Sequence, residues 1–191
     1  NSIDSSDLER LCRSTPGLVV LDEAYWRFSR VSSLELIESH ENLLILQTLS
    51  KIGFAGLRVG MLYGPKAWVD LLHKIRMPYN VNSLSQAGAL FALDHEKLVR
   101  YNVDWVIEER DWMLAELSGF ENLKVWPSKA NFILVRTLNR SGFDVFNELK
   151  ENGFLVKDMS NSHLALQNCL RITIGNHEEN TKFLDKFSKS I

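Results

Sequence analysis

Two short runs of consecutive apolar residues, each ending abruptly in polar side chains, constrain the fold of this chain more than any other feature. One is Leu18 to Leu21, which acidic residues follow, and the other is Leu43 to Leu46, which stops at Gln47-Thr48. An unbroken apolar run of this length is typical of a strand covered on both faces, as in a parallel sheet. A third run, Val59 to Tyr63, lies between glycines. We therefore expect three buried strands in an α/β sheet.

Helical periodicity follows the third run. Pro65 is expected as the first residue of a helix that extends to about Ile75, and Asn82 or Ser83 as the cap of the next helix. A longer amphipathic helix is expected from about Glu96 to Leu117.

The last third of the chain has a different pattern. Short strands are predicted at 125–127, 131–135, 154–156 and 170–174, with helices near 142–151 and 177–189. This β-β-α-β-β-α order indicates a small α+β domain. We place the domain boundary between residues 1–95 and residues 96–191, with the long helix in the second domain.

Charge and cysteine content narrow the class of protein. The 22 Lys and Arg residues against 24 Asp and Glu residues give a net charge of only -2, which argues against nucleic-acid binding or a polybasic membrane module. The two cysteines are far apart, and no apolar run reaches the length of a membrane span. The five histidines have no metal-ligand spacing. We expect a cytoplasmic protein without membrane, nucleic-acid or metal partners, and a processed or excised chain, because it lacks an initiator Met.

Residues with reactive side chains follow the first two apolar runs. Ligands of open α/β sheets bind beyond the carboxyl ends of strands, where we expect Asp22 and Tyr25 after one run and Thr48, Ser50 and Lys51 after the other. Arg58 lies in the turn that comes next. Pyridoxal phosphate requires such a set: a lysine for the Schiff base, a carboxylate for the pyridine nitrogen, and donors for a phosphate dianion.

Other interpretations of these residues stay open on the pattern alone. A Ser-Lys pair after a strand is usually an ordinary loop, and the chain could be a noncatalytic interaction module. The run ending in Asp22-Glu23 also resembles a Walker B strand, which would make Asp22 a magnesium ligand in a nucleotide hydrolase. That reading requires a GxxxxGK[ST] loop, which the 191 residues lack.

Four segments in order closely resemble the histidinol-phosphate aminotransferases, a family of fold-type-I pyridoxal-phosphate enzymes, over nearly the whole chain. They are Leu18-Val-Val-Leu-Asp-Glu-Ala-Tyr25, Thr48-Leu-Ser-Lys51-Ile-Gly-Phe-Ala-Gly-Leu-Arg-Val-Gly60, Pro78-Tyr-Asn-Val-Asn-Ser83 and Leu170-Arg-Ile-Thr-Ile-Gly175. The resemblance implies the C-terminal part of the large cofactor domain followed by a small α+β domain.

The resemblance also implies a role for each site residue. Lys51 is then the Schiff-base lysine, Asp22 lies on the pyridine nitrogen and Tyr25 on the ring's 3-oxygen. Ser50 and Arg58 then bind the cofactor phosphate, and Thr48 adds a further polar contact. Arg171 matches the arginine that holds the anionic end of the substrate, although alone it could equally form a structural ion pair.

Two departures from the family pattern accompany these matches. The interval from Lys51 to Arg58 is one residue shorter than usual, with Ile52 in place of a small residue, which we interpret as a loop variant. The family chain also continues well upstream of Asn1, so this resembles the C-terminal half and is expected to have little activity alone.

The implied reaction transfers an amino group from histidinol phosphate to 2-oxoglutarate in histidine biosynthesis, in a homodimer. An aromatic aminotransferase or a threonine-phosphate decarboxylase of the same fold is the nearest alternative.

Overall fold

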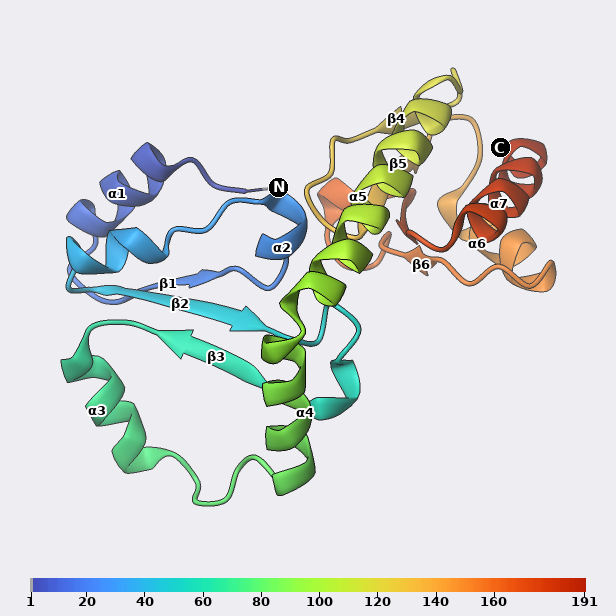
Figure 1. Cartoon of the computed structure of the whole chain (residues 1–191). Helices are drawn as coiled ribbons and strands as arrows, with labels where there is room; N and C mark the ends of the chain where they lie inside the picture. The colour runs from blue at the N-terminus through green and yellow to red at the C-terminus, as the bar shows by residue number, and fades with distance from the viewer. Residues whose placement is uncertain (1) are drawn as a thin grey trace. The chain divides into compact units, whose positions relative to one another are not determined.

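A three-stranded sheet in the order β1-β2-β3 organises the first half of the chain (Figure 1). The computed structural model describes residues 2–191, which divide into two compact units, 2–103 and 104–191. Strand β1 (Val19–Asp22) pairs parallel with β2 (Leu43–Thr48), and β3 (Gly60–Tyr63) pairs antiparallel with β2. The helices of this unit are α1 (Ser5–Ser14), α2 (Trp26–Ser29), α3 (Lys66–Ile75), α4 (Ser83–Asp94) and the first part of α5 (Glu96–Ser118), with 3-10 turns at Leu34–Glu38 and Ala55–Leu57.

One face of this sheet is covered by α1. Leu8 and Cys12 of that helix form a buried cluster with Val19, Leu43 and Ile45. Burial raises the pKa of the Cys12 thiol, and the nearby Glu9 raises it further, so the thiol packs as a small neutral group.

Burial on both faces is confirmed for β2 but wrong for its two neighbours. Val20 of β1 is 54% exposed and Leu62 of β3 is 38% exposed, because these outer strands have one face that the described residues leave uncovered. An apolar run therefore predicted a strand correctly in each case, but in β1 and β3 one face of the strand is exposed.

The helix ends follow local hydrogen bonding. The side chain of Asn82 accepts from the backbone N–H of Ser85 at 2.9 Å, which confirms Asn82 as the cap of α4. Pro65, by contrast, keeps an extended ψ of 141° and is the cap rather than the first residue of α3. Helix α1 was not predicted from the sequence at all.

The 104–191 unit is a four-stranded antiparallel sheet in the order β4-β5-β7-β6. Its elements are β4 (Leu123–Val125), β5 (Phe132–Thr137), α6 (Gly142–Glu151), β6 (Lys157–Asp158), a 3-10 turn (Leu164–Leu166), β7 (Cys169–Thr173) and α7 (His177–Ser190). The predicted order β-β-α-β-β-α is confirmed. The predicted strand at 154–156 is wrong, since pairing with β7 begins only at Lys157, and Phe154 and Val156 pack against the core instead.

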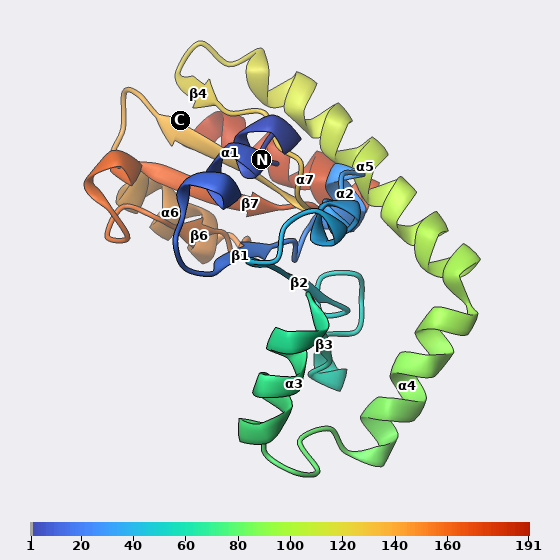
Figure 2. The ribbon, with the colours of Figure 1, turned by 90° about the vertical axis from the view of Figure 1, so that its left-hand side faces the viewer.

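Helices cover one face of this second sheet. Met113 and Leu117 of α5, Val145 and Leu149 of α6 and Phe183, Leu184 and Phe187 of α7 pack with the inward residues of β4, β5 and β7. Figures 1 and 2 place α6 and α7 on the same side of the strands. The division between the units falls inside α5, which the boundary predicted after residue 95 assigned whole to the second domain. No helix formed by residues 2–191 has the length and hydrophobicity of a membrane span.

Candidate functional site

The carboxyl ends of β1 and β2 lie at one edge of the first sheet. The register pairs Asp22, the last residue of β1, with Leu46, and β2 ends two residues later at Thr48. Tyr25 follows β1, and Ser50 and Lys51 follow β2. The parallel pairing therefore gathers five of the predicted site residues at this edge, as expected for an open α/β sheet.

Asp22 shapes the turn that leads to Tyr25. Its carboxylate oxygen Oδ1 accepts from the backbone N–H of Ala24 at 2.9 Å, an Asx-type turn that bends the chain away from the sheet. The Asp22 side chain is exposed. Tyr25 is half-buried and occupies the N-cap position of α2, where its carbonyl accepts from the N–H groups of Phe28 and Ser29.

Thr48 and Ser50 form a hydroxyl pair at the end of β2. Their hydroxyl oxygens lie 3.0 Å apart, and the backbone N–H of Ser50 donates to the Thr48 hydroxyl, also at 3.0 Å. The Thr48 hydroxyl lies 3.2 Å from the carbonyl oxygen of Val59, to which it can donate. Thr48 thus joins the two ends of the loop between β2 and β3.

Lys51 is brought to Tyr25 from a different loop. Its amine nitrogen Nζ lies 5.5 Å from the centroid of the Tyr25 ring, within cation–π range. The side chain is exposed and forms no salt bridge with a carboxylate of residues 2–191. The structure therefore presents an amine beside a phenol at the sheet edge.

Arg58 has a left-handed backbone, with φ 57° and ψ 33°, just before the loop returns to the sheet. Such angles are uncommon for a residue other than glycine, and strained residues of this kind concentrate at functional sites. The loop is closed beside Arg58 by the pairing of Thr48 with Gly60 and by the N–H of Leu49 donating to Val59. The Arg58 side chain is exposed, and within residues 2–191 no hydrogen bond joins it to Ser50 or Lys51.

Arg171 lies in the other unit, on β7. Its register partners are Leu134 on β5 and Lys157 on β6, and its guanidinium carbon lies 5.1 Å from the centroid of the Phe132 ring. The Nε atom is buried without a hydrogen-bond partner, and no carboxylate of residues 2–191 pairs with this guanidinium. The structural ion pair that the sequence left open is therefore absent from the described residues.

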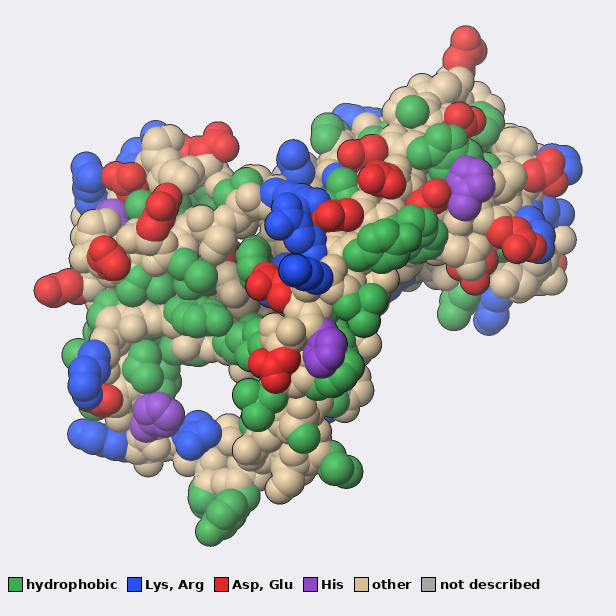
Figure 3. All heavy atoms as spheres, viewed as in Figure 1, with side chains coloured by type: hydrophobic (Ala, Val, Ile, Leu, Met, Phe, Trp, Pro, Cys, Tyr) green, Lys and Arg blue, Asp and Glu red, His purple; other side chains and the backbone are tan. Residues whose placement is uncertain are grey.

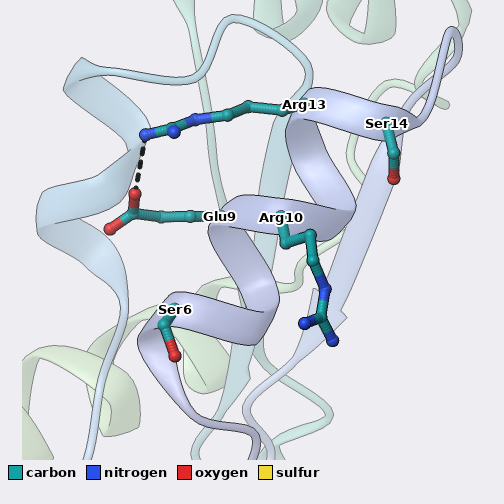
Figure 4. Close-up of a pocket in the computed structure, with 5 residues that line it drawn as sticks. All are labelled: Ser6, Glu9, Arg10, Arg13 and Ser14. Atoms are coloured by element: carbon teal, nitrogen blue, oxygen red, sulfur yellow. Dashed lines mark hydrogen bonds and ion pairs between the residues drawn. The ribbon is translucent and has the colours of Figure 1, made fainter.

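Other surface features do not carry the chemistry of this edge. The hollow in Figure 4 lies along α1 and is lined by Ser6, Glu9, Arg10, Arg13 and Ser14. Its charged lining residues form exposed ion pairs, Arg13 with Glu9 at 2.9 Å and Arg10 with Asp7 at 2.9 Å. Within residues 2–191 no three His, Cys, Asp or Glu side chains are grouped to hold a metal.

Sequence reasoning missed a buried polar group next to the site. Glu23 and Gln47, the neighbours of Asp22 and Thr48, are both buried and hydrogen-bonded to each other. The available signal was Gln47, a polar residue placed directly after the apolar run of β2.

Comparison with known proteins identifies relatives of the chain. The family model for aminotransferase class I and II matches residues 2–187. The histidinol-phosphate aminotransferase of Vesicomyosocius okutanii is 42% identical over 189 residues, which cover 99% of this chain and 52% of that protein. The enzyme of the same name from Flavobacterium psychrophilum is 43% identical, over 96% and 53%. The chain thus spans about half the length of the curated relatives it matches.

Solved structures show the same fold. A histidinol-phosphate aminotransferase from Clostridium acetobutylicum superposes with a TM-score of 0.90 at 21% identity, over 98% of this chain and 59% of that one. An enzyme of the same name from Sinorhizobium meliloti, solved in complex with pyridoxal-5'-phosphate, gives 0.84 at 20% identity, over 98% and 53%. These likenesses confirm the fold-type-I α/β class expected from the sequence. With a family model that matches nearly its whole length, the chain belongs to the aminotransferase class I and II family.

Proposed function

We propose that this chain carries the cofactor-binding edge of a pyridoxal-phosphate-dependent aminotransferase that acts on histidinol phosphate. The observation that carries the proposal is the approach of the Lys51 amine to the Tyr25 ring, at the edge where Asp22 and Thr48 end their strands. A reactive amine beside a phenol and a carboxylate fits the chemistry of this cofactor.

The donor set matches each part of the cofactor. Pyridoxal phosphate, when bound, supplies an electron sink for the carbanion at the substrate α-carbon. Lys51 would hold it covalently and then move a proton at that carbon through Nζ. Asp22 would keep the pyridine nitrogen protonated, and Tyr25 would donate to the ring's 3-oxygen.

The phosphate of the cofactor requires several donors. Ser50 and Arg58 supply a hydroxyl and a guanidinium, which bind a dianion through charge-assisted hydrogen bonds. Thr48 orients the Ser50 hydroxyl through the contact at 3.0 Å. Arg58 has no competing acidic partner among residues 2–191, so its charge is available.

Arg171 would bind the anionic end of the substrate, since its buried Nε lacks an acceptor within the described residues. The names of the relatives support histidinol phosphate as the amino donor. We infer 2-oxoglutarate as the acceptor, with L-glutamate and imidazole-acetol phosphate as the products. A homodimer and a cytoplasmic location complete the proposal.

A decarboxylase of the same fold is the alternative with structural support. The L-threonine-O-3-phosphate decarboxylase of Porphyromonas gingivalis superposes with a TM-score of 0.86 at 23% identity, over 98% of this chain and 59% of that one. Release of carbon dioxide from a phosphorylated amino acid, without formation of glutamate, would favour it.

Borohydride reduction in the presence of pyridoxal phosphate tests the proposal. We expect the stable pyridoxyl label on Lys51, and its loss in Lys51→Ala. The control variant Lys74→Ala removes an exposed lysine of α3 and should leave the label in place. A label spread evenly over the lysines would remove Lys51 from the site.

A further inference from the structure

A buried carboxylate lies directly behind the predicted site. Glu23 is only 8% exposed, and its oxygens accept from three donors: the backbone N–H of Ser33 at 2.6 Å, the hydroxyl of Ser32 at 2.8 Å and the side-chain amide of Gln47 at 2.9 Å. The same amide nitrogen lies 3.3 Å from the Ser32 hydroxyl. All three donors are neutral, and no cation within residues 2–191 pairs with this carboxylate. Its contribution is therefore to fix geometry through hydrogen bonds.

These bonds close the segment that carries Tyr25. The segment leaves the sheet at Glu23, whose N–H donates to Leu46 at 2.8 Å, and its far end returns to the Glu23 side chain at Ser32 and Ser33. Both ends of the stretch 23–33 are thus held at one residue. Tyr25 and the short helix α2 lie inside this closed loop.

The same network ties the loop to β2. Gln47 immediately precedes Thr48, so its amide links the Tyr25 segment to the strand whose end carries Ser50 and Lys51. The Tyr25 ring and the Lys51 amine come from these two linked segments and lie 5.5 Å apart. Because a four-residue helix such as α2 makes few bonds of its own, this distance depends on how the segment is anchored.

We propose that Glu23 is a positioning residue, which holds the Tyr25 segment against the end of β2 and so sets the phenol relative to the Lys51 amine. The inference rests on the proposed function, because Tyr25 and Lys51 matter there as cofactor ligands. Glu23 itself does not touch the reacting atoms. It acts through the segment 23–33 and through Gln47.

Amide hydrogen exchange of the whole chain tests the anchoring. Glu23→Ala leaves the Ser33 N–H buried without its acceptor and leaves the Gln47 amide only the Ser32 hydroxyl, 3.3 Å away. Exchange in residues 24–33 should therefore become about 5- to 150-fold faster. Helix α1, in the same unit, should change little. The control Glu35→Ala removes an exposed glutamate of the neighbouring 3-10 turn and should leave 24–33 protected.

A second variant tests whether geometry rather than charge is responsible. The exchange Glu23→Gln with Gln47→Glu keeps one carboxylate and one amide. The amide oxygen at position 23 can accept from Ser33, and the carboxylate at position 47 can accept from Ser32 and from that amide. This double variant should restore the slow exchange of residues 24–33 that Glu23→Ala loses.

A spectroscopic titration with pyridoxal phosphate as the probe tests whether Glu23 positions Tyr25 relative to the Lys51 amine. If Glu23 positions Tyr25, Glu23→Ala should shift the midpoint of the pH-dependent absorbance of the Lys51-bound probe by about 0.5 unit or more, and the double variant should restore it. Two outcomes would overturn the inference about Glu23 while leaving the proposed function intact. One is faster exchange of residues 24–33 in Glu23→Ala with an unshifted absorbance midpoint, and the other is unchanged exchange of residues 24–33. If the unaltered chain labelled Lys51 no better than Lys74, the proposed function would fall and the inference with it.

Discussion

The two units of this chain differ in how completely they bury their apolar side chains. The 104–191 unit encloses thirteen buried residues in one cluster, whereas the cluster of the 2–103 unit has five, in a segment of similar length. Figure 3 shows hydrophobic side chains gathered over β1–β3 and α3, with open solvent between α3 and α4. The unit that carries Lys51 is therefore the one with the smaller core.

The difference arises from the sheets. In the 104–191 unit, α5, α6 and α7 cover one face of an antiparallel sheet, and the other face has polar side chains such as Lys124, Arg136 and Arg171. In the 2–103 unit the face opposite α1 is apolar, yet it is exposed along the outer strands β1 and β3. The large apolar residues exposed on this unit include Val20, Leu62, Leu71, Ile75, Leu84, Leu90 and Phe91.

The uncovered face is also the face of the site. Side chains alternate along a strand, so Val20 and Asp22 share a face of β1. The register places Leu46 beside Asp22 and Leu62 beside Leu46, on that same face. An apolar surface of this extent is typical of an interaction surface. The comparison shows that this chain presents its predicted site residues on a face that residues 2–191 leave partly exposed.

The largest stability effect is expected in the well-packed unit. Phe187 is completely buried in the 104–191 cluster, so Phe187→Ala should lower the free energy of unfolding by about 3 to 5 kcal/mol. The matched change Ile75→Ala, at a residue 79% exposed on α3, should stay within about 0.5 kcal/mol. Hydrogen exchange in residues 132–137 and in α1 would report each unit separately. Equal losses of unfolding free energy in Phe187→Ala and Ile75→Ala would contradict the difference in packing between the two units.

The second prediction concerns catalysis by the chain on its own. Water at the uncovered face weakens the fixed electrostatic environment on which catalysis depends, so transamination should be at least about a hundredfold slower than in a full-length relative. The measurement follows conversion of bound pyridoxal phosphate to the pyridoxamine form with L-glutamate. A rate equal to that of the Vesicomyosocius okutanii enzyme would show that the cover is unnecessary.

A pair of glycine substitutions compares packing in the two units. A Cβ atom at Gly142 would lie 2.7 Å from the Cα and 2.9 Å from the carbonyl carbon of Asn168, and backbone cannot move aside as a flexible side chain can. Gly142→Ala should therefore cost about 1 to 3 kcal/mol. Gly56, with no atom within 4 Å of a Cβ, should accept alanine nearly without cost. Thermal unfolding of both variants checks the order, which the reverse result would contradict.

The sequence predicted strand positions better than burial. The apolar runs that begin at Leu18, Leu43 and Val59 coincide with β1, β2 and β3, because consecutive apolar residues favour a buried strand. Such a run does not indicate which other element covers the strand. Val20 was expected to be buried and is exposed because no element of residues 2–191 covers that side of β1.

The candidate site was predictable in position but only partly in contact. Parallel pairing brings the carboxyl ends of β1 and β2 to the same edge of the sheet. The residues that follow these ends are therefore gathered there: Asp22, Tyr25, Thr48, Ser50 and Lys51. The left-handed backbone of Arg58 and the Glu23 network depend on how loops close, which residue spacing does not specify. The roles of the site residues stay a prediction until they are tested chemically.

The smallest expected effect is a pH response within the better-packed unit. Hydrogen bonds hold the pKa of Glu148 below its ordinary value, first from the Ser190 hydroxyl at 2.8 Å and then from Arg140 at 2.9 Å. A carboxyl whose folded-state pKa is lowered adds stability above the ordinary glutamate pKa, and this stability is lost as pH falls through the folded-state value.

Ser190→Ala should therefore raise the pKa of Glu148 toward that of an ordinary glutamate, because it removes the largest of these contributions. The stability that the ionised Glu148 carboxylate adds should then be lost at a higher pH than in the unaltered chain. NMR titration of the Glu148 carboxyl carbon measures the change. Glu178 is the internal control, since its pKa is lowered by Lys182 and not by Ser190. An unmoved Glu148 titration, or an equal shift of Glu178, would show that the Ser190 contact does not stabilise the ionised carboxylate.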